Sequence, residues 1–196
     1  FTVTENGKNL RYYVDAIGYN AFNGCGNITT ITFNSRNAAR VIGEYAFAGT
    51  KISQIALPGT LKTIGNYAFN KCESLKNITI PASVTSFGKN AFSDCSSLTS
   101  ATFEPGLQTI PEYAFSNCQS LQNITIPASI GTISDNAFSK CYSMSSLILE
   151  SGIKNIGNFA FSECRDLKNI TIPASVDSIG SFAFYKCIAQ KRLRLR

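Results

Sequence analysis

The sequence contains no histidine, and only 15% of its 196 residues are charged. Without histidine, the chain cannot form the Ser–His or Cys–His pairs of many nucleophilic enzymes, nor the Cys/His ligand sets of many structural zinc sites. No two of its seven cysteines are separated by only two residues, so a CxxC motif is absent as well. We therefore expect a protein that is not an enzyme and that holds no metal or other cofactor.

Long apolar runs are absent too. A helix that spans a bilayer needs about 20 consecutive apolar residues, and the longest apolar run in this sequence is far shorter. There is no signal peptide, and the chain begins with Phe1 rather than Met. No linker rich in Pro, Ser or Gly interrupts the sequence. We expect one domain over residues 1–196, part of a larger protein, without direct membrane insertion.

The formal net charge of +6 is unevenly distributed along the chain. Five of the 18 basic residues lie within the last eleven positions, namely Lys186, Lys191, Arg192, Arg194 and Arg196. The other 13 are nearly balanced by the 12 acidic residues. A nucleic-acid-binding surface needs basic residues clustered along one face, so we expect no nucleic-acid partner.

A repeated dipeptide, Ala-Phe, indicates the architecture of the protein. Its eight copies end at Phe22, Phe47, Phe69, Phe92, Phe115, Phe138, Phe161 and Phe184. The first two intervals are 25 and 22 residues, and the next five are all 23. Repetition at a fixed period of this length is typical of a solenoid, in which each repeat buries its apolar face against its neighbours. The sequence therefore predicts about eight coils of 23 residues and an extended contact surface.

One repeat, residues 75–97, shows the expected elements. Ile78 and Ile80 alternate with polar residues, which predicts a short strand with both isoleucines facing inward. Pro81 cannot donate to a sheet ladder and ends the strand. Ala91 and Phe92, followed by a cysteine, have helical or 3-10 spacing, so we expect a short helical return to the core.

The same strand pattern recurs in every repeat. Its inward pairs are Ile31/Phe33, Ile55/Leu57, Ile78/Ile80, Ala101/Phe103, Ile124/Ile126, Leu147/Leu149, Ile170/Ile172 and Leu193/Leu195. This predicts eight parallel strands in one sheet. In residues 1–14, Asn6-Gly7 separates two alternating apolar runs, which predicts an N-terminal β-hairpin that caps the repeats of residues 15–196.

The cysteines occupy one position of the repeat. Each lies three residues after the Phe of an Ala-Phe pair, and Thr50 fills that position in the one repeat without a cysteine. We interpret them as a row of buried free thiols, because side chains with one shared orientation hold their Cβ atoms farther apart than a disulfide prefers.

A second period, of 46 residues, runs through the turns. Pro81, Pro127 and Pro173 recur in the motif ITIPAS, whereas the intervening repeats contain Glu104-Pro105-Gly106 and Glu150-Ser151-Gly152. This predicts two alternating turn geometries. A further shared position, two residues before the repeat Phe, holds Tyr45, Tyr67, Tyr113, Phe159 and Phe182. We expect these aromatic residues to pack between coils, or to anchor a partner.

The LxxIxI strand, the SIGxxAF return and the CxxL link together resemble the BspA-like, or Treponema pallidum-type, leucine-rich repeats. The stretch Leu61–Phe69, LKTIGNYAF, is similar to that type over its whole length, and the resemblance covers about residues 14–187. It implies an α/β leucine-rich repeat solenoid with its parallel sheet on the concave face. It also implies a secreted or cell-surface protein that adheres to host matrix or cell-surface proteins. No catalytic residues come with the resemblance.

Side chains beside the inward strand residues are expected to form the ligand-binding surface, on the concave face. The candidate residues are Asn77, Thr79, Ser100, Thr102, Glu104, Asn123, Thr125, Ile148, Glu150, Asn169 and Thr171. This surface is small, polar and nearly uncharged, which suits hydrogen bonding to a peptide or a glycan. Thr is also favoured on a pleated surface for packing alone. The alternative function is therefore a structural spacer that projects another domain and binds no ligand.

Overall fold

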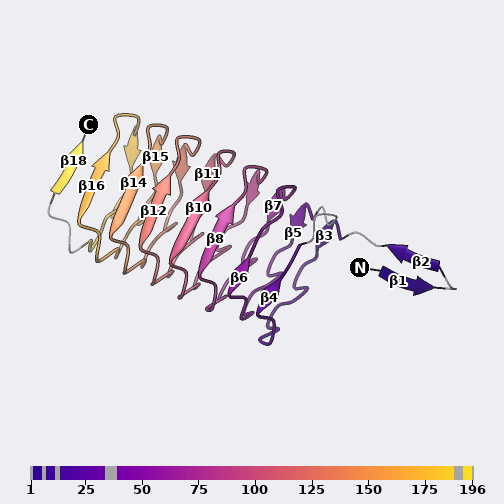
Figure 1. The fold of residues 1–196 in the computed structure, drawn as a ribbon. Helices are drawn as coiled ribbons and strands as arrows, with labels where there is room; N and C mark the ends of the chain where they lie inside the picture. The colour runs from indigo at the N-terminus through magenta and orange to yellow at the C-terminus, as the bar shows by residue number, and fades with distance from the viewer. Residues whose placement is uncertain (1, 6–7, 12–13, 34–38, 188–191, 196) are drawn as a thin grey trace.

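The computed structural model describes residues 2–5, 8–11, 14–33, 39–187 and 192–195, and the side chains of residues 14–33 and 39–187. Its coils stack in one row, with the chain ends at opposite ends of the row (Figure 1). Each coil contributes strands to two faces. All pairings within these faces are parallel. The fold is thus a parallel β-solenoid.

The strands of the two faces alternate along the chain. The even-strand face consists of β4 (Thr30–Ile31), β6 (Gln54–Ile55), β8 (Asn77–Ile80), β10 (Ser100–Phe103), β12 (Asn123–Ile126), β14 (Ser146–Leu149), β16 (Asn169–Ile172) and β18 (Arg192–Leu195). The odd-strand face consists of β3 (Ala16–Ile17), β5 (Val41–Ile42), β7 (Thr63–Ile64), β9 (Ser86–Phe87), β11 (Thr109–Ile110), β13 (Thr132–Ile133), β15 (Asn155–Ile156) and β17 (Ser178–Ile179). The sequence pattern identified the first series and missed the second.

Two features of the predicted architecture are wrong. The eight strands of the even-strand face, β4 to β18, belong to a solenoid of about seven turns, so eight complete coils do not form. They also do not make one sheet, because hydrogen bonding divides them into the groups β4–β6, β8–β14 and β16–β18. The first Ala-Phe copy shows why the count is too high. Phe22 is 38% exposed and therefore does not complete a core layer as its later counterparts do.

The predicted helical returns are also wrong, because the described residues contain no helix. The residues two before and two after the repeat Phe have positive φ, for example Asn90 at 56° and Asp94 at 61° on either side of Phe92. A right-handed helix cannot contain left-handed residues at this spacing. Hydrogen bonds to the next coil replace helical ones, since the Phe92 N–H donates to the Ala114 carbonyl (2.9 Å).

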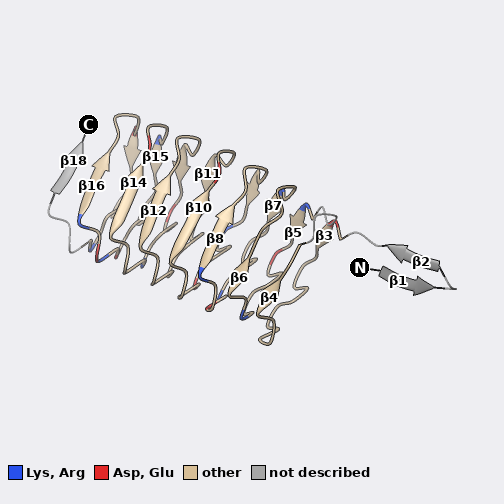
Figure 2. Cartoon of the chain, in the orientation of Figure 1, with Lys and Arg blue, Asp and Glu red and all other residues tan. Residues whose placement is uncertain are grey.

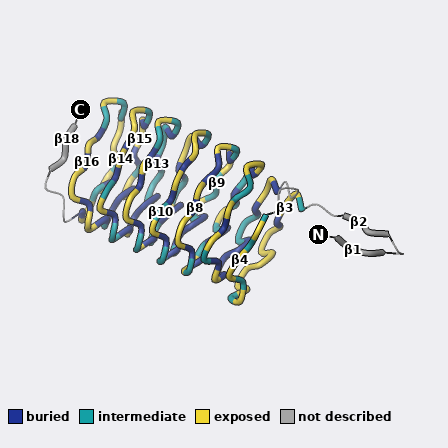
Figure 3. The backbone as a smooth tube through the Cα atoms, in the orientation of Figure 1, coloured by how far each residue is buried: buried dark blue, intermediate teal, exposed yellow. Residues whose placement is uncertain are grey.

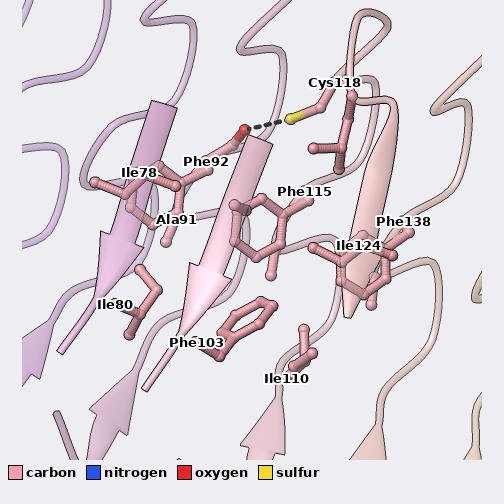
Figure 4. Close-up of a cluster of buried hydrophobic side chains, with 14 of the residues drawn as sticks. Ile78, Ile80, Ala91, Phe92, Phe103, Ile110, Phe115, Cys118, Ile124 and Phe138 are labelled. Atoms are coloured by element: carbon pink, nitrogen blue, oxygen red, sulfur yellow. Dashed lines mark hydrogen bonds between the residues drawn. The ribbon is translucent and has the colours of Figure 1, made fainter. Parts of the chain in front are cut away.

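The core is a stack of phenylalanine rings. From Phe47 to Phe161 each repeat Phe is fully buried, and neighbouring ring centroids lie 5.0–5.4 Å apart. Figure 4 shows Phe92, Phe115 and Phe138 in this row, with Ile78, Ile80 and Phe103 reaching it from the strands. Figure 3 shows buried stretches repeating along the central coils, whereas the first coil is mostly exposed or intermediate. Each ring is covered by the rings of two adjacent coils, which makes the core continuous along the solenoid.

Six of the seven cysteines form the predicted buried row, and Cys25 is exposed instead. Each buried thiol donates to the Phe carbonyl of the preceding repeat, as Cys118 Sγ does to Phe92 O at 3.2 Å (Figure 4). Thr50 differs from the cysteines, because its hydroxyl donates to the Phe47 carbonyl of its own repeat, at 2.8 Å. Burial raises the pKa of Cys72 to about 11, so the thiols keep the protons that they donate.

The alternating turns interlock. The Ala82 N–H, in an ITIPAS turn, donates to Glu104 Oε2 of the following coil (3.0 Å), and Ala128 does the same to Glu150 (3.0 Å). A Cβ atom on Gly106 would lie 2.1 Å from the Ala82 carbonyl oxygen, so that position requires glycine. The Glu-x-Gly turns therefore hold the ITIPAS turns through one carboxylate and one close backbone approach.

The predicted N-terminal hairpin is present. β1 (Thr2–Glu5) and β2 (Lys8–Arg11) pair antiparallel, while Asn6-Gly7 lies outside the described residues. Its role as a cap stays a prediction. Within the described ranges no helix is long and apolar enough to cross a membrane.

Candidate functional site

The structure places the candidate residues along the even-strand face. Most of them are exposed, and Ser100 is half-buried. Parallel register aligns Thr79 with Thr102, and Thr125 with Ile148. Ile148 is 54% exposed and interrupts the polar row with an apolar side chain. Figure 2 shows β8 to β16 almost wholly uncharged, with charged residues near the strand ends and in the turns.

Two candidate residues have a structural partner. Glu104 and Glu150 each accept a hydrogen bond from the backbone of the preceding coil, at 3.0 Å. Sequence reasoning treated them as isolated acids on a binding surface, because the contact joins residues 22 positions apart. Their carboxylates hold the alternating turns together.

A groove opens where the sheet is interrupted. No described pairing joins β6 to β8, although β4 pairs with β6 and β8 with β10. A hollow of about 630 Å³ lies across this interruption. Its lining consists of Thr30, Ile31, Thr32, Phe33, Gln54, Ile55, Ala56, Leu57, Asn77, Ile78, Thr79, Pro81 and Glu104. We call this hollow the β4–β8 groove.

The groove combines apolar and polar groups. Ile31, Phe33 and Leu57 are half-buried in its lining, whereas Thr30 and Gln54 are exposed polar residues of the same lining. Among the described residues of its lining there is no Lys or Arg, and their one carboxylate, Glu104, is already hydrogen-bonded. Apolar surface bordered by a few hydrogen-bonding groups is typical of a recognition site.

Only Asn77, Thr79 and Glu104 of the candidate residues line the groove. The others lie beyond it, on β10 to β16 and the turns that follow. Sequence reasoning omitted Thr30, Gln54 and Ala56 from the candidate site. A signal was present in the spacing, because Phe47 and Ile55 are eight residues apart, whereas Phe69 and Ile78 are nine apart. The connection that leads into β6 is therefore one residue shorter than the next one.

Among the residues that the structure describes, no three His, Cys, Asp or Glu side chains are grouped to hold a metal ion. The buried thiols are poor nucleophiles, because burial raises their pKa values and the thiolate is the reactive form. Geometry and electrostatics thus favour recognition through shape and hydrogen bonds.

The stacked coils and the repeated LxxIxI strands define a leucine-rich repeat solenoid. The chain belongs to the BspA type leucine rich repeat region family, whose model matches six copies over residues 15–145 and 131–196. This confirms the resemblance that the repeat pattern indicated. Among curated proteins, none matches the chain.

Solved structures with the same fold come from bacteria. A leucine-rich repeat protein from Bacteroides ovatus is 28% identical, with a TM-score of 0.68, over 99% of this chain and 61% of that one. One from Eubacterium ventriosum is 30% identical, with a TM-score of 0.70, over 74% of this chain and 40% of that one. A leucine rich cell surface protein from Faecalibacterium prausnitzii, 23% identical over 91% of this chain and 62% of that one, shares the fold with a TM-score of 0.51. This chain therefore spans less than two thirds of the length of each.

Proposed function

We propose that the protein is a non-enzymatic, secreted or cell-surface binding module that engages a host matrix or cell-surface protein through the β4–β8 groove. The observation that carries this proposal is the hollow of about 630 Å³ at the interruption between β6 and β8. Membership of a repeat family built on extended surfaces supports a binding role. Nucleic acid and direct membrane insertion are not part of the proposal.

The composition of the groove specifies the kind of contact. An apolar side chain of the partner would pack on Ile31, Phe33 and Leu57, and its backbone would exchange hydrogen bonds with Gln54 and Asn77. Partly buried apolar area bordered by polar groups is the usual anatomy of a protein interface. The groove has little net charge, so electrostatic steering is weak and we expect affinity to change little with ionic strength.

The spacer is the second candidate function. It is favoured by the continuous β8–β14 ladder, whose outward residues other than Ile148 have short polar side chains, and by the uninterrupted ring stack beneath it. Such a rod needs no ligand of its own. Unlike the binding module, a spacer is expected to show no saturable binding to any partner.

Two double variants test the proposal with one matched control. Binding of the purified protein to immobilised fibronectin, laminin, collagen and cultured epithelial cells is measured for each. Ala56→Lys/Thr79→Lys places two charges in the groove, and Thr125→Lys/Ile148→Lys places two on the ladder. We expect saturable binding by the wild type and the ladder variant, and at least about tenfold weaker binding by the groove variant.

Other outcomes would assign the function differently. Equal loss in both variants would extend the site over the whole even-strand face. Loss in the ladder variant alone would place the partner on β12 and β14. Absence of saturable binding by the wild type would favour the spacer.

A further inference from the structure

The odd-strand face carries a second hollow, of about 420 Å³, that the function proposed above does not use. It crosses β13, β15 and β17, and hydrogen-bonding side chains supply much of its lining. These side chains include Thr132, Asp135, Asn155, Asn158 and Ser178. Because the hollow belongs to the other strand series, a ligand there would be distinct from one in the β4–β8 groove.

The polar side chains of this hollow stand in rows. Register aligns Thr132, Asn155 and Ser178 on successive coils. A second row, joined by hydrogen bonds from each coil to the next, is formed by Asp135, Asn158 and Ser181. Neighbouring parallel strands lie about 4.8 Å apart. Each row therefore presents hydrogen-bonding groups at a regular spacing, which suits a ligand that is itself a repeating chain.

The rows are held in fixed orientations and still have capacity for hydrogen bonds. Asp135 accepts from the backbone and side-chain nitrogens of Asn158, at 2.7 and 3.0 Å. Ser178 donates to Asn155 Oδ1 at 2.8 Å. Within the described residues the Asn155 Nδ2 and Thr132 Oγ1 atoms have no hydrogen-bond partner. Amides and hydroxyls with free donors and acceptors can pair with hydroxyl groups of a ligand.

Two exposed aromatic residues directly follow the second row in sequence. Phe159 and Phe182 stack with their ring centroids 5.1 Å apart, and they are 37% and 60% exposed. Both have positive φ, at 54° and 57°. Asn136 occupies the same position of its repeat at 57°, and Asn tolerates this conformation better than an aromatic residue does. Positive φ recurs at this position in the other repeats, including Tyr45, Tyr67 and Tyr113, so it belongs to the fold, and it is the exposed ring pair that indicates a site.

We propose that the two polar rows and the Phe159–Phe182 pair bind a neutral oligosaccharide or polysaccharide. A pyranose ring offers hydroxyl groups to the rows and an apolar C–H face to an aromatic ring. Glu112 pairs with Lys89 at 2.9 Å and Asp177 with Lys154 at 3.8 Å, which leaves Asp135 as the one carboxylate of the described lining without a described basic partner. The surface therefore has little net charge to select a charged glycan.

The test measures binding of the purified chain to four neutral hexasaccharides by calorimetry: cellohexaose, laminarihexaose, mannohexaose and chitohexaose. We expect at least one to bind with a Kd of about 10 μM to 1 mM, as an open site allows. Phe159→Asn/Phe182→Asn introduces the residue that other repeats carry at this position, as at Asn90 and Asn136. This variant should keep or raise the melting temperature and bind at least about tenfold more weakly.

A second variant and a control complete the test. Asn155→Ala removes the free amide donors and should also weaken binding about tenfold. Thr125→Lys/Ile148→Lys, on the other face, should bind like the wild type. No binding of any of the four sugars, or undiminished binding in both odd-face variants, would overturn the proposal. The protein-binding groove would remain testable in either case, because its assay uses different partners and different residues.

Discussion

The first turn and the central turns of the solenoid are built from the same sequence positions, but they differ in how completely they bury the residues at those positions. Phe22 is 38% exposed, whereas Phe115 is fully buried, and Cys25 is exposed, whereas Cys118 is buried. A Cβ on Gly18 would meet nothing within 4 Å. The comparison shows that a residue acquires its role from the coils on both sides of it, because no single repeat can bury its own apolar face.

The same difference appears on the even-strand face. In the central part β8 to β14 form one ladder, whereas β4 and β6 pair only with each other. The β4–β8 groove lies at the boundary between these two parts. The region whose strands do not join the central ladder is thus also the region with space for a partner.

The largest expected difference between the regions concerns the ring stack. Phe115→Ala should lower the free energy of unfolding by about 3–5 kcal/mol, because it leaves a cavity between two covered rings. Phe22→Ala should cost less than about half as much, since that ring is partly hydrated already. Urea denaturation of both variants measures the difference. Equal losses would show that the first turn is closed in solution.

A glycine pair gives the next largest effect. A Cβ on Gly88 would lie 2.3 Å from the Asn66 backbone nitrogen. Gly88→Ala should therefore cost about 1–3 kcal/mol, as overpacking does, while Gly18→Ala stays within about 0.5 kcal/mol. Pro111 and Ser134 occupy this position in two other repeats, so the cost arises from the close approach at Gly88. Thermal unfolding distinguishes the two variants, and a silent Gly88→Ala would contradict the observed coil spacing.

The thiols should make stability depend on pH. Burial raises the pKa of Cys72 to about 11 and moves that of Cys118 in the same direction. A raised folded pKa stabilises the protein below the pKa of the unfolded thiol, about 8.5, and this contribution is lost as pH rises toward the folded value. Between pH 8 and 9.5 the free energy of unfolding should fall by about 1 kcal/mol for each buried thiol.

The control for this prediction comes from the chain itself. Cys118→Thr uses the residue found at Thr50 and should reduce the pH dependence by one thiol, as measured by urea denaturation at pH 8 and 9.5. Cys25→Thr, at the exposed cysteine, is measured alongside as the control. An identical pH dependence in all three proteins would rule out the thiols as its source.

The smallest effects are expected on the outer surface. Glu104→Ala removes the acceptor of the Ala82 N–H and should cost about 1 kcal/mol. Thr102→Ala, two residues earlier, should change stability by less than about 0.5 kcal/mol. Comparison of their melting temperatures separates a residue that joins two coils from one that only faces solvent. A larger loss for Thr102→Ala would reverse the two roles.

The sequence predicted the features that follow from periodicity. The inward strand residues, the buried thiols and the family could be read from it, because each recurs at one repeat position. The prediction of helical returns was wrong, because it relied on the spacing of the apolar residues and not on the residue types between them. Asn90 and Asp94 on either side of Phe92 are residue types that adopt left-handed backbone readily, and their recurrence could have indicated turns.

The candidate site was harder to predict than the fold. Asn77 and Thr79 were identified as outward residues and do line the groove. The groove itself depends on a strand pairing that is interrupted, which no single residue reveals. Glu104 was assigned to ligand binding because its partner, the Ala82 N–H, is a backbone group that sequence patterns do not show.

Hydrogen–deuterium exchange of the free protein, resolved strand by strand, tests whether the even-strand face is closed from β8 to β14 and open at β4 and β6. We expect the amides of β10 and β12 to exchange at least about tenfold more slowly than those of Thr30–Ile31 and Gln54–Ile55. Uniform protection along the whole face would contradict the account, because β6 and β8 would then be joined and the groove closed.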